Sequence, residues 1–322
     1  MAGKTSEVDI ADARGTEELL DDVIAGLAAT NKSLPSKYFY DEAGSRLFDE
    51  ITRLDEYYVT RTEQAIMDRH AGEMGEQIAE NVMLVEYGAG SSIKTRALLD
   101  HLDDPVAYVP VDISREHLNQ SAESLQAAYP DIEVLPVVGD FTQPFELPIA
   151  RRTPDHVAAY FPGSTIGNFE TEAAHRILRG IAPLCGSGGG LLIGVDLQKD
   201  PAVIEAAYND VDGVTSRFNL NLLRRINREL GGDFDLSQFR HLATYDEKAG
   251  CVRTFIVSDV DQIVNVAGRQ FSFASDERIH TENSYKYTID GFAGDAAEAG
   301  LELHRVWTDA RDYFAVMHFV VP

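Results

Sequence analysis

The spacing of apolar side chains changes character near residue 82 of this chain. Over residues 16–28, leucine, isoleucine and valine recur at helical intervals, which predicts an amphipathic helix. A second helix is expected over 61–70, where Thr60 and Glu63 have the spacing of a capping box at its start. From residue 82 onward, short apolar runs replace this pattern and alternate with helical stretches.

Alternating strands and helices occupy the middle of the chain. The apolar runs predict strands at 82–87, 106–112, 132–140, 156–161 and 190–196. The stretches between them predict helices at 93–102, 115–128 and 171–182. This alternation is typical of βαβ units, so we expect an α/β fold with a doubly wound, mostly parallel sheet.

The alternation ends near residue 200. Residues 201–230 have a helical pattern, 250–273 predict short strands, and 282–299 predict a helix that Gly300 closes. Two final apolar runs, joined by a short turn, predict a closing pair of strands.

These elements predict two domains. The sheet domain would comprise 62–196 plus 287–322, and a smaller α+β substrate lobe would comprise 1–61 plus 197–286. A lobe built from an N-terminal piece and an insertion is expected over the carboxyl edge of the sheet, where open α/β folds bind ligands.

The charge of the chain restricts its partners. Its 322 residues include 28 lysines and arginines against 53 acidic residues, a net charge of −25. This charge repels phosphate backbones and anionic lipids, so we expect no nucleic-acid partner and no membrane partner. Adaptation to salt would also explain the acidity, and unchanged stability between low and molar salt would contradict that explanation.

Further classes of protein are excluded by missing patterns. No apolar run approaches the roughly 18 residues of a membrane span, and the first residues are polar, so we expect neither a membrane span nor a secretory signal. Cys185 and Cys251 lack a CxxC spacing, which favours a reducing cytoplasm. The nine histidines form no metal-binding motif, so no metal site is expected. The sequence leaves the oligomeric state undefined; we expect a monomer.

A glycine turn follows the first expected strand. In "LVEYGAGSSIKTRALL", Gly88 permits a tight turn, and Gly90 lets backbone N–H groups approach a ligand at the start of the next helix. Ile93 stands where a dinucleotide-binding loop would have its third glycine. The turn alone is a weak signal, since an ordinary strand–helix connection would also explain it.

Two features at the ends of later strands strengthen this signal. Asp112 ends the second strand, where a carboxylate can bind both hydroxyls of a ribose. Asp140 and Phe141 end the third strand and offer a hydrogen-bond acceptor beside an aromatic face suited to adenine. Together these residues resemble the Rossmann-like S-adenosylmethionine-dependent methyltransferases, whose pattern includes the acid at Glu86 and a terminal antiparallel strand pair. The missing third glycine suits this class better than NAD binding, because no pyrophosphate has to be accommodated.

Longer motifs resemble one family of this class, the histidine-specific N-alpha-methyltransferases of ergothioneine biosynthesis. They are "SLPSKYFYDEAGSRLFDEITRLDEYYVTRTE", "EYGAGSSIKTR", "FPGSTIGN", "AAYNDVDGVTSRFNLNLLRRINREL" and "TENSYKY". The similarity runs from about residue 20 to the C-terminus. It implies that histidine is converted by three methyl transfers to hercynine, with S-adenosylmethionine as donor and S-adenosylhomocysteine as product.

The resemblance also implies a cofactor site. The cofactor would be contacted by Tyr40, Gly88, Lys94, Asp112, Asp140 and Phe141. Tyr40 and Lys94 would approach its methionine part, where Lys94 would pair with the carboxylate.

A substrate site is implied in the same way. The substrate would be contacted by Tyr57, Gly163, Asn168, Tyr208, Thr254, Glu282 and Ser284. Asn168 and Tyr208 would hold the carboxylate, while Glu282 and Ser284 would bind the imidazole. The tyrosine-rich stretch 37–58 would form a lid over the sheet. Tyr40 and Tyr57 from this lid are the candidate catalytic residues, and Tyr57 and the backbone near Gly163 would face the α-amino group.

Several of these residues have simpler explanations. Tyr57 fits an amphipathic packing position, and Tyr208 fits a contact between helices. Asn168 fits the cap of the following helix, and Glu282 fits the first turn of the last one. Lys94 is harder to explain without a ligand, because a cation in the first turn opposes the helix dipole.

One position departs from the family. Thr254 stands where members of the mycobacterial type have a methionine that lines the imidazole pocket, so the pocket is altered beside the ring. Histidine remains the expected substrate, with another amino acid or small amine as the alternative. A non-catalytic S-adenosylmethionine-binding protein is a second alternative, and a nicotinamide dehydrogenase ranks below both.

Overall fold

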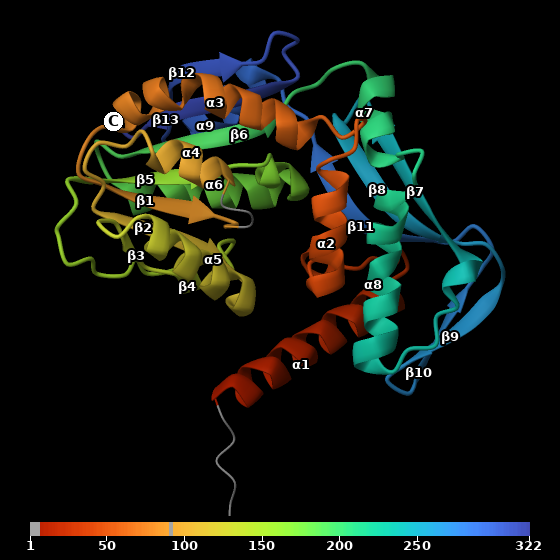
Figure 1. Ribbon diagram of the computed structural model, residues 1–322. Helices are drawn as coiled ribbons and strands as arrows, with labels where there is room; N and C mark the ends of the chain where they lie inside the picture. The colour runs from red at the N-terminus through yellow and green to blue at the C-terminus, as the bar shows by residue number, and fades with distance from the viewer. Residues whose placement is uncertain (1–6, 90–92) are drawn as a thin grey trace, which may run out of the picture. The chain divides into compact units, whose positions relative to one another are not determined.

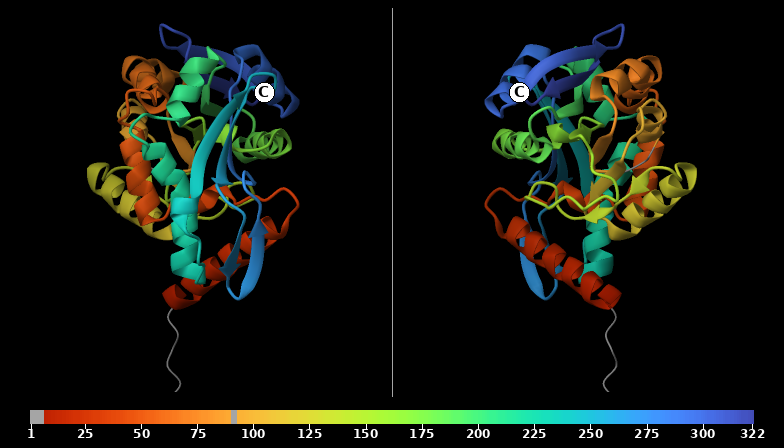
Figure 2. Two further views of the ribbon diagram at one scale, coloured as in Figure 1. Left: turned by 90° about the vertical axis from the view of Figure 1, so that its right-hand side faces the viewer. Right: turned by 90° about the vertical axis from the view of Figure 1, so that its left-hand side faces the viewer.

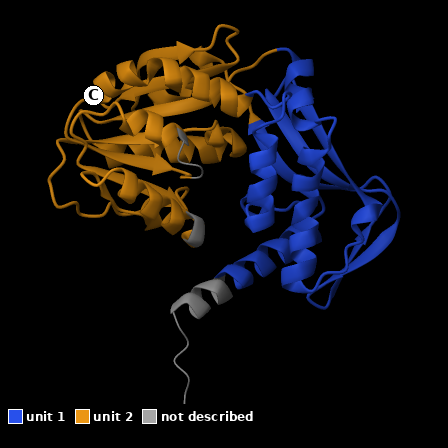
Figure 3. Cartoon of the chain, in the orientation of Figure 1, with its two compact units in different colours: residues 1–58, 200–284 blue, residues 59–199, 285–322 orange. Residues whose placement is uncertain are grey.

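The computed structural model describes residues 7–89 and 93–322, and the chain divides into two compact units (Figure 3). Unit 1 comprises residues 1–58 and 200–284, and unit 2 comprises residues 59–199 and 285–322. The boundaries lie at 59, 200 and 285, where the sequence had indicated 62, 197 and 287.

Unit 2 is built on a sheet in which the structure describes eight strands. The strands are β1 (Val82–Tyr87), β2 (Ala107–Asp112), β3 (Glu133–Val134), β4 (Val137–Val138), β5 (His156–Phe161), β6 (Gly190–Asp196), β12 (Glu302–Thr308) and β13 (Phe314–Val320). Their order is β12-β13-β6-β5-β1-β2-β3, and β4 also pairs with β2. Pairing is parallel from β6 to β3 and antiparallel for β13 and β12, which confirms the expected fold class.

Helices cover both faces of this sheet (Figures 1 and 2). They are α3 (Val59–Ile78), α4 (Ile93–Leu99), α5 (Arg115–Ala128), α6 (Thr171–Cys185) and α9 (Ile289–Glu298). All residues of β1 and β6 are buried, and so are the first five of β2. Because both faces are covered, these strands have the uninterrupted apolar sequences from which they were predicted.

Unit 1 combines helices with two small antiparallel sheets. Its helices are α1 (Glu7–Ala28), α2 (Glu42–Ile51), α7 (Pro201–Tyr208) and α8 (Val214–Leu230), with short 3-10 helices η1 (Ser36–Phe39) and η3 (Leu236–Gln238). Its strands are β7 (Phe239–Asp246), β8 (Cys251–Ser258), β9 (Gln262–Val266), β10 (Arg269–Phe273) and β11 (Arg278–Tyr285). The sheets are β11-β8-β7 and β10-β9.

The core of unit 1 forms around α8. Leu222 and Ile226 of α8 share one apolar cluster with residues of α1, β8 and the β9–β10 hairpin. Figure 2 shows α1 crossing beside α8 and this hairpin. The region 201–230, which was expected to be helical, forms the two helices α7 and α8. They are separated by residues 209–213, where Gly213 has φ +65°.

Three local expectations were wrong. The run 132–140 forms two short strands rather than one, because Pro136 between them has no N–H for the strand ladder. The helix expected over 282–299 begins at Ile289, and residues 282–285 form the end of β11. Thr60 does not cap α3, because the helix already begins at Val59. Gly300, in contrast, follows α9 with φ +84°, as the sequence indicated.

Candidate active site

The glycine turn of unit 2 joins β1 to the segment before α4. Gly88 has φ +71°, a conformation that strongly favours glycine, and its N–H donates to Val111 O of β2 at 3.0 Å. A Cβ at Gly88 would lie 3.7 Å from Cε1 of Phe141. The turn therefore runs directly beside the predicted adenine-facing ring. Gly90 lies outside the described residues.

Glu86 anchors the turn from beneath. Its Oε2 accepts hydrogen bonds from the Tyr108 hydroxyl at 2.6 Å and from Thr95 Oγ1 at 2.7 Å. These partners belong to β2 and to the first turn of α4. Burial raises the pKa of this carboxyl to about 7, although both hydrogen bonds act in the opposite direction. The acid of the glycine motif thus ties three elements together.

The predicted adenosine-binding residues lie at the carboxyl ends of neighbouring strands. Asp112 ends β2, and its Oδ1 accepts from Ser114 N at 2.8 Å. Asp140 follows β4, and its Oδ1 accepts from both N and Oγ1 of Thr142, at 2.9 and 2.6 Å. The ring of Phe141 packs edge-on against Tyr87, with centroids 5.6 Å apart. This edge of a parallel sheet is where ligands bind in open α/β folds.

Lys94 forms part of a buried ionic cluster that spacing did not reveal. Its ammonium pairs with Oε2 of Glu63, whose side chain is 1% exposed. Both oxygens of Glu63 accept from Gly163 N, at 2.9 and 3.0 Å. A Cβ at Gly194 would lie 2.2 Å from Glu63 Oε1, so a glycine in β6 makes room for the carboxylate. Glu63, assigned to a capping box by its sequence position, instead joins Lys94 to the loop after β5.

Asn168 is the last residue of the 3-10 helix η2 (Thr165–Asn168) in the "FPGSTIGN" motif. It does not cap α6, because Glu170 occupies that position, so the simpler explanation for this asparagine is wrong. The loop before η2 is fixed by Ser164, which has φ 56° and whose Oγ accepts from Asp196 N at 2.9 Å.

The tyrosine-rich stretch has two kinds of tyrosine. Tyr38 and Tyr58 are buried, at 8% and 2% exposure, and Tyr38 belongs to the core cluster of unit 1. Tyr40 is 41% exposed, and its ring lies edge-on to Phe48. Tyr57 is half-buried, and its ring lies edge-on to Tyr208 with centroids 6.3 Å apart. The two predicted catalytic tyrosines are thus the two that the core does not enclose.

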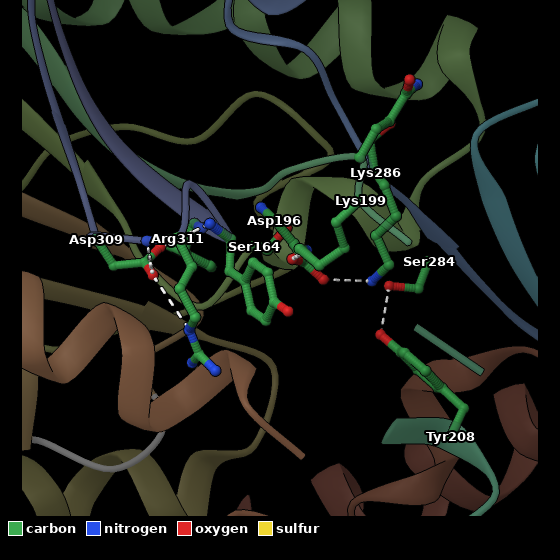
Figure 4. Close-up of polar contacts among 11 residues, drawn as sticks. Ser164, Asp196, Lys199, Tyr208, Ser284, Lys286, Asp309 and Arg311 are labelled. Carbon is green, nitrogen blue, oxygen red and sulfur yellow. Dashed lines mark hydrogen bonds and ion pairs between the residues drawn. The ribbon is translucent and has the colours of Figure 1, made fainter. Parts of the chain in front are cut away.

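The predicted imidazole and carboxylate ligands of unit 1 lie on three elements. Tyr208 ends α7, and its hydroxyl is 2.8 Å from Ser284 Oγ of β11 (Figure 4). Glu282 also lies on β11, so its assignment to a helix start is wrong. Thr254 of β8 is 3% exposed, and among the described residues its Oγ1 has no hydrogen-bond partner.

A second buried cluster, also missed from the sequence, lies at the end of β6. Asp196 is fully buried and pairs with Lys286 at 2.7 Å and Lys199 at 2.5 Å (Figure 4). Burial lowers the pKa of Lys199 to about 8, although the charge of Asp196 acts against this. The cluster connects the segments 197–199 and 285–287. A backbone hydrogen bond connects the same two segments, since Gln198 N donates to Tyr287 O at 2.9 Å.

Within the described part of the chain, no three histidine, cysteine or acidic side chains are grouped as metal ligands. A search of the same residues finds no helix that is long and apolar enough to cross a membrane.

The chain is similar to a family model and to known proteins. The family model described as "Histidine-specific methyltransferase, SAM-dependent" matches residues 19–321. The chain is 39% identical to a histidine N-alpha-methyltransferase of Mycolicibacterium smegmatis, over 93% of this chain and 94% of that protein. It is 32% identical to ergothioneine biosynthesis protein 1 of Neurospora crassa, over 88% of this chain but 32% of that longer protein. Among solved structures, LaPhzM shares the fold, with a TM-score of 0.50 and 13% identity over 98% of this chain and 72% of that chain.

Proposed function

Because the chain belongs to the histidine-specific, S-adenosylmethionine-dependent methyltransferases, we propose that it methylates the α-amino nitrogen of L-histidine. Three transfers would give hercynine, in the first step of ergothioneine biosynthesis. The name of the bacterial relative supports the α-amino nitrogen as the site of methylation, and the name of the fungal relative supports the pathway.

One observation carries the assignment of the amino-acid site. Tyr57, Tyr208 and Ser284 form a continuous cluster in unit 1, with Tyr57 packed on Tyr208 and Tyr208 bonded to Ser284. An amino acid presents its amino and carboxylate groups on one carbon, so groups that bind them have to be neighbours. Tyr57 is proposed to bind the amino group, and Tyr208 and Asn168 are proposed to bind the carboxylate.

The residues of unit 2 fit the cofactor. The turn at Gly88 passes beside Phe141, and Asp112 stands at the end of the adjacent strand. Among the described residues both hydrogen bonds of Asp140 use Oδ1, which leaves Oδ2 to accept a bond from the adenine amino group. Lys94 would bind the carboxylate of the methionine part. When bound, S-adenosylmethionine supplies an electrophilic methyl group.

The protein has to present a neutral amine. An α-amino group titrates at roughly 7.7–8.0 in peptides, and higher beside a free carboxylate, so histidine arrives mostly protonated. We propose that the phenol of Tyr40 or Tyr57 hydrogen-bonds the amine of the substrate and relays the proton of the amine to water. After methylation, the tyrosine ring would turn its face to the methylated cation. The backbone near Gly163 would orient the amine, and Glu63 holds that backbone in place.

Side-chain recognition would come from β11. Glu282 would accept a hydrogen bond from a ring N–H or an imidazolium, and Ser284 would add a second polar contact. The buried, unpartnered hydroxyl of Thr254 favours a substrate with a polar side chain. The second candidate function is therefore methylation of another polar amino acid.

Mass spectrometry of products tests the proposal. The enzyme is incubated with S-adenosylmethionine and each proteinogenic amino acid in turn. We expect histidine alone to gain three methyl groups. A product from another amino acid and none from histidine would favour the second candidate, and no product from any amino acid would contradict both.

We also infer that the enzyme acts as a cytoplasmic monomer without a nucleic-acid partner. Cys185 and Cys251 are buried free thiols, which suits a reducing compartment. The net charge of −25 disfavours binding to nucleic acid.

A further inference from the structure

A hydrogen-bonded network inside unit 1 ends at the backbone of Tyr208. Asn219 of α8 is 1% exposed, and its Nδ2 donates to His241 Nδ1 and to Phe255 O, both at 2.9 Å. Thr281 of β11 donates from Oγ1 to Asn219 Oδ1 at 2.9 Å. His241 of β7 in turn places Nε2 2.8 Å from Tyr208 O. Four elements are thus joined to the last residue of α7.

These partners define the protonation of His241. The carbonyl of Phe255 can only accept, so Asn219 must direct Nδ2 toward it and Oδ1 toward the Thr281 hydroxyl. Its remaining N–H points at His241 Nδ1, which must therefore accept. The proton lies on Nε2, which donates to Tyr208 O. Burial lowers the pKa of this imidazole, in keeping with a neutral ring.

The bond to Tyr208 has a local cause. Tyr208 is the last residue of α7, and the final carbonyls of a helix have no partner within it. His241 satisfies this carbonyl, while the side chain of Asn209 donates to Glu205 O and Ala243 O, at 2.9 and 3.1 Å. The end of α7 is therefore attached to β7 through Tyr208 O and through Asn209, and these bonds fix the backbone that carries the Tyr208 ring.

We infer that His241, oriented by Asn219, is a positioning residue that sets the Tyr208 hydroxyl for the substrate's carboxylate. The inference rests on the proposed role of Tyr208. It adds a residue that touches no substrate and that no motif indicated, since the imidazole acts through the backbone of its neighbour. Loss of its bond to Tyr208 O should weaken binding of the amino acid and leave binding of the cofactor unchanged.

Two substitutions of His241 separate positioning from simple packing. His241→Gln places an amide nitrogen near the position of Nε2 and keeps the donor to Tyr208 O. His241→Asn places an amide oxygen near the position of Nδ1 and keeps the acceptor for Asn219, but it loses the bond to Tyr208. Both remove one hydrogen bond and replace the ring by an amide.

We expect His241→Asn to raise the KM for histidine roughly tenfold, the effect of one lost hydrogen bond, with kcat and the Kd of S-adenosylhomocysteine unchanged. His241→Gln should stay within about twofold of the unsubstituted enzyme. Equal KM values for the two variants, or a larger change for His241→Gln, would overturn the inference.

Two further measurements keep the outcome interpretable. Tyr208→Phe should raise the KM for histidine by itself; an unchanged KM would contradict the proposed carboxylate site, and with it the inferred effect of His241 on substrate binding. In the unsubstituted protein, ¹⁵N NMR of labelled histidine should show His241 neutral with its proton on Nε2. This measurement does not depend on the folding of a variant. A proton on Nδ1 would exclude the bond to Tyr208.

Discussion

Glu63 is almost fully buried and joins Lys94, a residue proposed for the cofactor, to the loop after β5. Its carboxylate receives the Gly163 N–H and the Lys94 ammonium, and the space for it exists because residue 194 is glycine. A lysine in the first turn of α4 would otherwise oppose the helix dipole. The ion pair offsets that cost and defines where the ammonium lies.

Glu63→Gln tests this role. The glutamine keeps an oxygen for Gly163 N but loses the charge that holds Lys94, so we expect binding of S-adenosylhomocysteine to weaken about tenfold. 5′-Methylthioadenosine, which lacks the amino-acid part, should bind with unchanged affinity. Titration calorimetry measures both ligands.

Glu73→Gln is the matched control, since Glu73 lies on the same helix and pairs with Arg305 near the surface. It should leave both affinities unchanged. Unchanged or tighter binding of S-adenosylhomocysteine to Glu63→Gln, or equal weakening of both ligands, would contradict the role of Glu63.

At the scale of elements, the sequence predicted best the strands that are buried on both faces. The boundaries of β1, β5 and β6 were predicted to the residue, because covered strands must be continuously apolar. β7 was not expected, and the last four residues of β11 were assigned to a helix, because polar side chains occupy the buried positions Thr281, Asn283 and Ser284 of β11. Where buried positions are polar, the sequence does not show the alternation of apolar and polar residues that predicts a strand.

The site shows the same division. Gly88, Asp112 and Asp140 lie at or just after the ends of β1, β2 and β4, and this placement could be predicted, because each strand end follows from its apolar run. Glu63 could not be predicted, because it and Gly163 lie 100 residues apart and meet only in the folded unit. Asn219 and His241 also belong to different elements, and neither has a charge or a motif that attracts attention.

A pH dependence of stability belongs to strand β13. His318 is 4% exposed, and burial, with His304 nearby, lowers its pKa to about 4. The unfolded chain binds a proton near pH 6.5, so the contribution of this residue is fully present above that pH. It is lost as the pH falls toward 4, where about 3 kcal/mol of unfolding free energy should be missing.

Urea unfolding between pH 7 and pH 4 measures this loss. His318→Leu should reduce the slope of unfolding free energy against pH. His304 lies at an exposed position of β12, so His304→Leu should retain most of that slope. If the slope is the same with and without His318, the buried imidazole is not its source.

At the scale of the whole molecule, the chain divides its chemistry between two compact units. Unit 2 holds the residues proposed for the cofactor, except Tyr40, and unit 1 holds most of those proposed for the amino acid. The reaction needs both sets, and the amino acid has to be bound by its amino and carboxylate groups as well as by its ring. We therefore propose that the α-amino nitrogen receives the methyl groups.

The position of the transferred methyl group tests this claim most directly. The enzyme converts histidine with S-adenosylmethionine labelled with ¹³C in its methyl group, and heteronuclear NMR locates the label in the product. We expect three equivalent labelled methyl groups correlated to the α-carbon and an unmodified imidazole. Label on a ring nitrogen, or none on the α-amino nitrogen, would contradict the account.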